Sequence, residues 1–266
     1  MFLDRLISCK LEKSYLDSID DSGNCFIIYL AKLDFSFMRI WYSGLIFSDK
    51  EGNQAENSSF NRSRTALTNG LLSFNSKRLR IDGTWERIDS PVLKSLYTDL
   101  GNNELIWNCH HPKALTEVRY AGNLYKGLGY AETITLTKTQ MRLPFEELRW
   151  GRFLSDNYTI TWVNWKGTHP LNILFLNGDE YLDSFHKDDI VLFCNGIYKL
   201  EFSGSQKIRT GKLSRIFSKM PLFKLFFSRM MLNAEEKKFK ARTVFSKNSV
   251  NLSQGWSIYE VVTWRS

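Results

Sequence analysis

The fold is decided by one stretch, Gly127–Gly167, which reads GLGYAETITLTKTQMRLPFEELRWGRFLSDNYTITWVNWKG. Two runs rich in β-branched and aromatic residues, 131–137 and 158–165, flank a break at Pro144. Runs of this composition favour β-strands. We expect the two strands to be neighbours, so that acidic, basic and aromatic side chains converge on one apolar cavity.

The composition is that of a globular protein rich in strands. Hydrophobic residues make up 43% of the 266 residues, charged residues 24% and aromatic residues 14%. This length is enough for one large domain or two small ones. The chain has no long apolar run of the kind that crosses a membrane, and its first residues carry acids and lack the apolar core of a secretory signal. We therefore expect a cytoplasmic protein.

Short strand-like runs separated by turn residues occur in the first half of the chain and again in the second half. Tight turns are expected at Asn177-Gly178 and Asn195-Gly196, because both residue types tolerate a positive φ. A polar loop is expected over 51–64. These features predict an all-β chain of two lipocalin-like halves, 1–120 and 121–266, arranged as two packed barrels or as one continuous sandwich. Strands are expected at 24–32, 38–47, 79–88, 104–109, 117–124, 129–138, 157–166, 169–176, 190–194, 196–203 and 256–264.

One segment, 213–240, departs from this texture. Phe223, Phe226, Phe227 and Met230 recur at helical spacing, which predicts a basic amphipathic helix. The surrounding stretch Lys199–Lys247 holds thirteen Lys or Arg and three acids, a balance of 13 − 3 = +10 in a chain whose formal charge is +8. Such a helix is a lid on a barrel, a contact with an anionic membrane surface, or a helix packed on the sheet with its charges solvated.

Two carboxylates of the central stretch are candidates for acid–base chemistry. Glu132 lies in a strand among aromatic and β-branched residues, and an inward orientation would raise its pKa and make it a proton donor. The alternatives are a solvent-facing carboxylate or a structural ion pair with Arg149 or Arg152. Glu147 is the second candidate, as a group buried with Arg149, although a buried pair by itself is weak support for catalysis.

The tripeptide Trp150-Gly151-Arg152 is unusual because glycine removes bulk where an indole and a guanidinium must pack. An aromatic wall of this kind could stabilise positive charge that develops on a polyene. The same residues could instead cap a barrel, and the sequence leaves both readings open.

Other kinds of chemistry find no support in the sequence. Cys9, Cys25, Cys109 and Cys194 form no CxxC pair, so reduced structural thiols are expected. His110 and His111 follow Cys109 directly in the sequence. This adjacency says little about a Cys-His catalytic dyad, because such a dyad needs closeness in space rather than in sequence. The GLGY motif is neither a P-loop nor a dinucleotide fingerprint. We expect no cofactor, no metal and no nucleic-acid partner.

At GLGYAE…LPFEELRWGRF…TWVNWKG the chain resembles the carotenoid 1,2-hydratase/AttH-like superfamily of lipocalin-related proteins, with tocopherol cyclases and β-barrel Diels–Alder cyclases as relatives. The strand MRIWYSG, Met38–Gly44, is similar to an aromatic strand near the start of that family's first barrel, and GWSIYEVVTW resembles its closing strand. The resemblance implies cofactor-free hydration or cyclisation of an isoprenoid or polyketide chain in an apolar pocket.

Taken together, these features predict a cofactor-free hydratase or cyclase of natural-product or isoprenoid metabolism. A lipid or pigment carrier without catalysis is the first alternative, and a scaffold at the inner face of the membrane is the second. The expected catalytic residues are Glu132, Glu147, Arg149 and Arg152, and the expected substrate-binding residues are Tyr130, Trp150, Trp162, Trp165, Trp41 and Tyr42.

Overall fold

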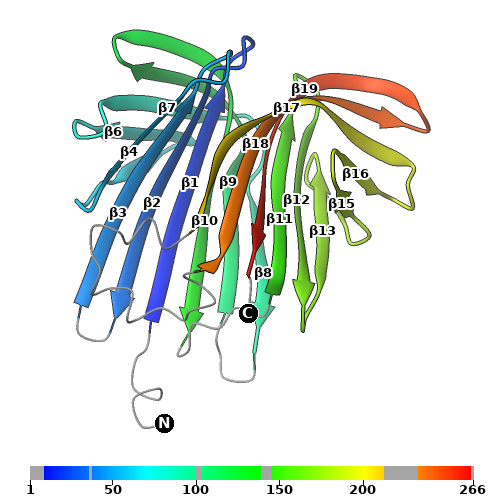
Figure 1. The fold of residues 1–266 in the computed structure, drawn as a ribbon, viewed down its shortest axis with the longest axis horizontal. Coiled ribbons are helices and arrows are strands. Elements are labelled where there is room, and N and C mark those ends of the chain that lie inside the picture. Colours follow the sequence, from blue (N-terminus) through cyan, green and yellow to red (C-terminus); the bar gives the residue numbers. More distant parts are fainter. Residues whose placement is uncertain (1–8, 36–37, 100–103, 139–144, 213–232, 265–266) are drawn as a thin grey trace. The chain divides into compact units, whose positions relative to one another are not determined.

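The computed structural model describes residues 9–35, 38–99, 104–138, 145–212 and 233–264. Within these residues, β-strands dominate and form two antiparallel sheets (Figure 1), so the predicted all-β class is confirmed. No helix in this part of the chain is long and apolar enough to cross a membrane.

The strands are numbered in the order in which they follow one another along the chain. The first sheet contains β1 (Cys9–Ile19), β2 (Cys25–Phe35), β3 (Met38–Ser48), β4 (Gln54–Ser59), β5 (Thr65–Thr68), β6 (Leu71–Ser76), β7 (Ile81–Arg87), β8 (Val92–Thr98), β9 (Glu104–Tyr120) and β10 (Asn123–Lys138). The second contains β11 (Phe145–Leu154), β12 (Thr159–Gly167), β13 (Leu171–Leu176), β14 (Asp179–Tyr181), β15 (Phe185–Lys187), β16 (Ile190–Phe193), β17 (Tyr198–Lys212), β18 (Glu235–Lys247) and β19 (Val250–Thr263).

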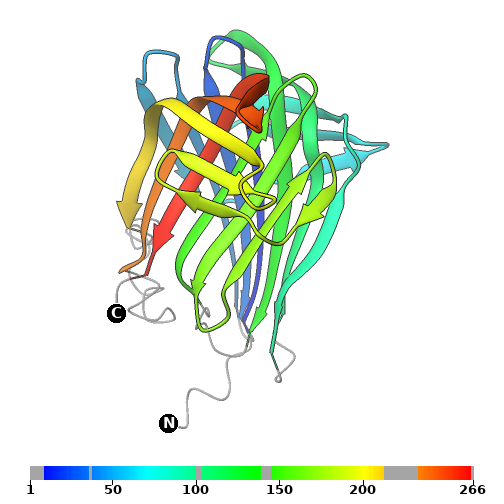
Figure 2. The same ribbon diagram turned by 90° about the vertical axis from the view of Figure 1, so that its right-hand side faces the viewer.

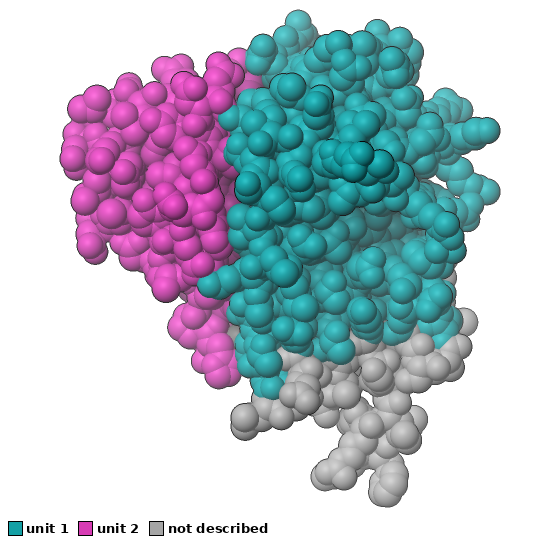
Figure 3. Space-filling view, turned by 180° about the vertical axis from the view of Figure 1, so that it is seen from behind, with its two compact units in different colours: residues 1–140 teal, residues 141–266 magenta. Residues whose placement is uncertain are grey.

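The chain divides into two compact units, Met1–Gln140 and Met141–Ser266 (Figure 3). The division falls after β10, twenty residues later than the predicted boundary at 120/121. The reason is that β10 pairs along one edge with β1 and along the other with β9, so it completes the first sheet. With both edges occupied, β10 has no edge left for β12. The expectation that the two strands of the central stretch are neighbours is therefore wrong.

In unit 1 the strand order is β4-β3-β2-β1-β10-β9-β7-β6-β5, and β8 pairs with β9. The sheet curls strongly, and one face encloses an apolar core (Figures 1 and 2). Leu16, Phe26, Ile28, Trp85 and Ala131 are among its buried members. Burial of each large aliphatic or aromatic side chain stabilises the fold by roughly 1.5–3 kcal/mol.

Unit 2 repeats this arrangement with the order β14-β13-β12-β11-β19-β18-β17-β16-β15. In each unit the first strand pairs with the last, and the meander runs outward from that pair to both edges. Its core contains Phe153, Trp162, Phe202, Phe245 and Tyr259. Each unit is thus a half-barrel, and the two share the order of strands that runs outward from the first–last pair, with β8 as an additional strand in unit 1.

The tight turns follow the predicted chemistry. Asn177 and Gly178 adopt φ of 51° and 95° between β13 and β14, and Asn195 and Gly196 adopt 54° and 81° between β16 and β17. One expected loop and one expected pair of strands are wrong. The polar segment 51–64 contains strand β4, and the expected strands 104–109 and 117–124 are largely one strand, β9, which ends at Tyr120.

The predicted basic helix over 213–240 is corrected at its C-terminal end. Residues 213–232 lie outside the described residues. Glu235–Lys240 is not helical but begins strand β18, which pairs with β17 and β19. Alternating burial along β18 explains this outcome, because Glu236, Lys238 and Lys240 are all buried while Lys237 is exposed.

Candidate functional site

Glu132 is a buried carboxyl in unit 1, on the sheet face opposite the apolar core. It pairs across the sheet with Tyr15, whereas its neighbour Ala131 pairs with Leu16. Because successive side chains of a strand point to opposite faces, Glu132 and Leu16 lie on different faces. Only 4% of Glu132 is exposed. The expected burial against aromatic residues is therefore present, within the first unit rather than the second.

Two aromatic donors hold one oxygen of this carboxyl. The Trp107 indole N–H and the Tyr130 hydroxyl both donate to Glu132 Oε2, each at 2.5 Å, and the two donors are themselves 3.2 Å apart. Because both donors bind Oε2, Oε1 is the oxygen on which a proton would reside. Burial raises the pKa of Glu132, although the hydrogen bonds from Tyr130 and Trp107 oppose the shift.

Two uncharged groups lie close to this carboxyl. Cys109 is a fully buried thiol, and burial raises its pKa well above the ordinary value. Burial likewise raises the pKa of Tyr130, so both groups are neutral at physiological pH. Two charged residues also act on Glu132: Lys13 lowers the pKa of its carboxyl, and Asp17 raises it. Burial has the largest effect, and it favours the neutral form of the carboxyl, which is the form that donates a proton.

Glu147 has the opposite electrostatic character. Burial raises its pKa, but ion pairs with Arg149 at 2.9 Å and Lys166 at 3.1 Å outweigh that effect and hold the pKa below its usual range. Glu147 is therefore ionised at neutral pH. Its predicted structural pairing with Arg149 is present in unit 2, on the same sheet face as Trp162.

Arg152 and Trp150 lie on the other face of β11, with Gly151 between them. Arg152 is fully buried, and its guanidinium donates to the Trp256 carbonyl at 3.0 Å. A Cβ at Gly151 would overlap the Trp162 indole. The glycine thus makes room for an indole, as its position suggested, but the indole belongs to Trp162 on the next strand and not to Trp150.

The remaining aromatic candidates have separate surroundings. Trp165 is buried, and its indole donates to the His169 carbonyl. The Trp162 indole donates to His186 Nδ1 at 3.1 Å inside the core of unit 2. Tyr42 folds over Gly44 and contacts Phe60 with ring centroids 5.7 Å apart.

The candidate residues therefore do not form one cavity wall. Tyr130 and Glu132 share a face in unit 1, and Trp41 lies on the opposite, core-side face. In unit 2, Glu147, Arg149 and Trp162 share the core-side face, and Trp150, Arg152 and Trp165 share the other. The prediction that these residues converge is replaced by four groups, because strand alternation separates adjacent residues and the chain division separates the two sheets.

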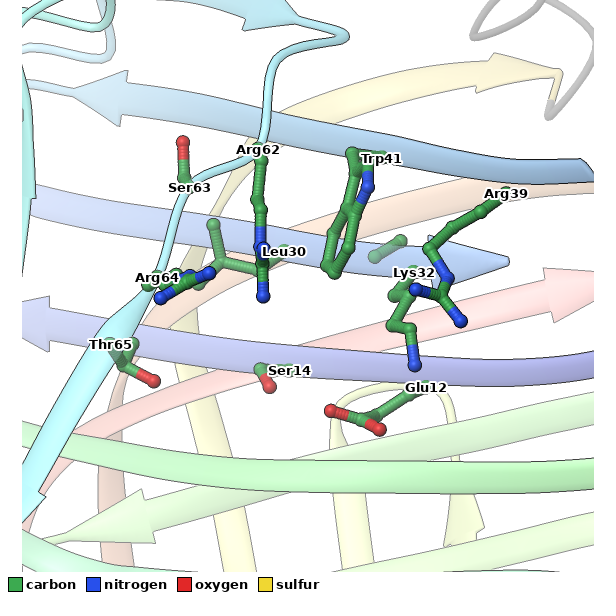
Figure 4. A pocket seen from close by; sticks show the side chains of 11 residues that line it. Glu12, Ser14, Leu30, Lys32, Arg39, Trp41, Arg62, Ser63, Arg64 and Thr65 are labelled. Carbon is green, nitrogen blue, oxygen red and sulfur yellow. The ribbon is translucent and has the colours of Figure 1, made fainter. Parts of the chain in front are cut away.

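A cavity of about 420 Å³ opens on the core-side face of unit 1 (Figure 4). Glu12 and Ser14 of β1, Leu30 and Lys32 of β2, and Trp41 of β3 line it. The segment between β4 and β5 closes it with Arg62, Ser63 and Arg64. Of the predicted site residues, Trp41 is the one that reaches this cavity. The cavity is lined by cationic, aromatic and aliphatic groups together.

A chain of polar groups that the sequence did not reveal starts at this cavity. Ser14 Oγ lies 3.0 Å from Thr133 Oγ1, which lies 3.4 Å from His110 Nε2. His110 Nδ1 lies 2.9 Å from His111 Nδ1. Burial lowers the pKa of both imidazoles, to about 4 for His110, so both are neutral at neutral pH. Only the pairing of β1 with β10 and of β10 with β9 brings these residues together.

Within the described residues, no group of three or more His, Cys, Asp or Glu side chains is placed to hold a metal ion. Within the part of the chain that the structure describes, Cys25, Cys109 and Cys194 form no disulfide bond.

No protein-family model and no curated protein sequence matches this chain. Solved structures do match its fold. A protein assigned as AttH from Nitrosomonas europaea has a TM-score of 0.59 at 7% identity, over 99% of this chain and 94% of its own. CghA with the compound Sch210972 has a TM-score of 0.57 at 7% identity, and the match covers 96% of this chain and 89% of CghA. Kievitone hydratase from Nectria haematococca has a TM-score of 0.56 at 10% identity, and the match covers 98% of this chain and 90% of the hydratase.

This chain thus shares its fold with the AttH-type protein, CghA and kievitone hydratase, and the resemblance predicted from the central stretch is confirmed as a likeness of fold.

Proposed function

We propose that this protein is a cofactor-free enzyme of the hydratase or cyclase type, in which Glu132 donates a proton to an apolar isoprenoid- or polyketide-type substrate. The observation that carries the proposal is the state of the Glu132 carboxyl. It is buried, its pKa is raised, and two donors occupy Oε2. Oε1 then carries the proton that a general acid delivers.

The chemistry follows from a neutral carboxyl in a dry surrounding. The acid proton adds to one carbon of a substrate double bond and leaves a cation on the other carbon. Water adds to that cation in a hydration, whereas another part of the substrate adds in a cyclisation. A final proton loss returns the proton to the Glu132 carboxylate, and Tyr130 and Trp107 stabilise that carboxylate while it is charged.

Glu147 is the less suitable acid. Its ion pairs with Arg149 and Lys166 keep it ionised, so it has no proton to give at neutral pH. Arg149 and Arg152 lie in unit 2, on opposite faces of β11, and are not assigned to the substrate of Glu132. Of the aromatic candidates, Tyr130 is the one that contacts Glu132. The solved structures of the same fold include a hydratase and CghA, a Diels–Alder cyclase, which supports the reaction class proposed.

A carrier without catalysis is the second candidate, and the cavity of unit 1 favours it. Trp41 and Leu30 give that cavity an apolar side, and a carrier needs no acid. The third possibility, a scaffold at an anionic membrane surface, depends on residues 213–232, which lie outside the described part of the chain.

The deciding experiment uses compounds that co-purify with the chain, identified by native mass spectrometry and then offered to the purified protein in D₂O. An acid catalyst places solvent deuterium on carbon in the product. We expect deuterated product from wild type and from Glu147→Gln, and a loss of at least about 10²-fold in its rate of formation with Glu132→Gln. Bound compounds that stay unchanged with wild type would establish the carrier and end the enzyme proposal.

A further inference from the structure

The segment between β4 and β5 places two like charges in the lining of the cavity of unit 1. These are the Arg62 and Arg64 side chains, which Figure 4 shows with Leu30 in the same cavity. Among the described residues, neither guanidinium has a carboxylate partner. Like charges in one cavity repel one another, and a bound anion reduces that repulsion.

Two other cations of the cavity share one carboxylate partner. Lys32 pairs with Asp34 at 2.7 Å, and Arg39 pairs with the same carboxylate. Burial raises the pKa of Asp34, but these two partners outweigh that effect and hold the pKa below its usual value. Glu12 of β1 is the one acid in the lining of the cavity. Arg62 and Arg64 are therefore the cations of this cavity that have no carboxylate partner among the described residues.

A second hollow extends the positive surface behind the same segment. Its volume is about 610 Å³, and its lining includes Arg62, Arg64, Lys77 and Arg78 without any Asp or Glu. Cations thus outnumber acids in the linings of both hollows, where Glu12 is the one acid. Such a surface raises the local concentration of anions.

The floor of the cavity is apolar and aromatic. The Arg62 guanidinium lies over the Trp41 ring at 4.7 Å from its centroid, and Lys32 lies over the same ring at 5.8 Å. Stacking on the indole holds Arg62 in place, since a cation over an aromatic face is stabilised by about 0.5–1 kcal/mol at an exposed site. Leu30 lies beside them.

From these contacts we infer that the cavity binds an amphipathic organic oxyanion. Arg62 and Arg64 hold its carboxylate, phosphate or sulfonate group, and its apolar body lies against Leu30 and Trp41. Two guanidinium groups match a planar or tetrahedral oxyanion by paired hydrogen bonds. This site lies on the sheet face opposite Glu132, so the inference is independent of the proposed acid chemistry.

The test is fluorescence titration of the full chain with two probes of similar shape, anionic anilinonaphthalene sulfonate and neutral N-phenylnaphthylamine. We expect the double variant Arg62→Gln/Arg64→Gln to bind the sulfonate at least about tenfold more weakly, a loss of 1.4 kcal/mol. The neutral probe should bind equally well to both proteins. Higher salt should weaken sulfonate binding to wild type only.

The matched control is Lys50→Gln/Lys187→Gln, which removes the same formal charge at two exposed positions outside the cavity. It should bind both probes as wild type does, and circular dichroism confirms that both variants fold. Equal weakening in the control, or equal weakening of the neutral probe, would overturn the inference.

The class of oxyanion follows from displacement of the bound sulfonate by lauric acid, dodecyl phosphate and dodecanol. Displacement by one or both of the anions assigns a carboxylate, a phosphate or either group. Displacement by dodecanol as effective as that by the anions would reduce the cavity to a purely apolar site and contradict the proposed role of Arg62 and Arg64.

Discussion

Glu132 and Glu260 occupy the same position in two sheets of equal strand order. Counted from the terminal pairs Ile19–Leu128 and Leu154–Trp256, the pairs Tyr15–Glu132 and Trp150–Glu260 are both the fifth along their strands. Each carboxyl is buried and lies opposite an aromatic residue, on the last strand of its unit.

Their partners differ in charge, and this gives the two carboxyls different states. Glu260 forms an ion pair with Lys238, which also binds Glu236 at 2.8 Å. Glu132 has the neutral donors Trp107 and Tyr130 in place of a lysine. One topology thus holds a charged pair in unit 2 and a carboxyl of raised pKa in unit 1.

The first prediction compares the stability cost of neutralising each carboxyl. Glu260→Gln leaves Lys238 buried with reduced compensation and should lower the free energy of unfolding by about 3 kcal/mol. Glu132→Gln replaces a neutral acid by a neutral amide that still accepts from Trp107 and Tyr130, so it should cost less than about 1 kcal/mol. Urea denaturation of both variants measures the difference, and equal costs would show that Glu132 is also charged.

The second prediction concerns the pH dependence that Glu132 contributes. Its pKa is raised in the folded protein above the ordinary value of 4.5. The folded state therefore binds more protons than the unfolded state above that pH, and the stability due to this group falls as the pH rises toward the folded pKa. Glu132→Gln removes this pH dependence. The stability of the variant relative to wild type should therefore increase as the pH rises. A stability difference that does not change with pH would contradict the raised pKa.

The third prediction has the opposite sign and concerns His186. Burial lowers the pKa of this imidazole to about 3, from an ordinary value of 6.5. The unfolded state binds the proton first, so the stability due to neutral His186 is present above pH 6.5 and is lost as the pH falls toward 3. His186→Gln should flatten that acid-side loss, as measured by thermal unfolding at several pH values. If the loss of stability at low pH is the same in the variant as in wild type, His186 is not buried as a neutral group.

The fourth prediction tests the packing of Gly151 against Trp162. Gly151→Ala forces a methyl group into the indole and should destabilise unit 2 by about 1–3 kcal/mol, the usual cost of overpacking. Trp162→Leu frees this space and should itself be destabilising. In the double variant the alanine should cost much less than in wild type. Additive costs would show that the two residues do not compete for the same volume.

The sequence by itself established the class of the fold and much of its local structure. Asn177-Gly178 and Asn195-Gly196 predicted their turns correctly because the required positive φ is a property of those residues alone. Short apolar and alternating runs predicted ten of the nineteen described strands for the same local reason, whereas β1, β11 and the short edge strands were among those not predicted. The buried state of Glu132 followed from its neighbours along one strand.

Pairing between distant strands decided what the sequence left open. One edge of β10 is filled by β1, more than a hundred residues away in the chain, and the other by β9, the strand directly before it, and this pairing moves the unit boundary to 140/141. The same pairing places Trp107 against Glu132 and His110 against Thr133. Residue identity fixes a local conformation, whereas the partner across a sheet is fixed by the global register. Pairing across the sheets also placed Glu132 and Glu147 in different units and shifted their pKa values in opposite directions.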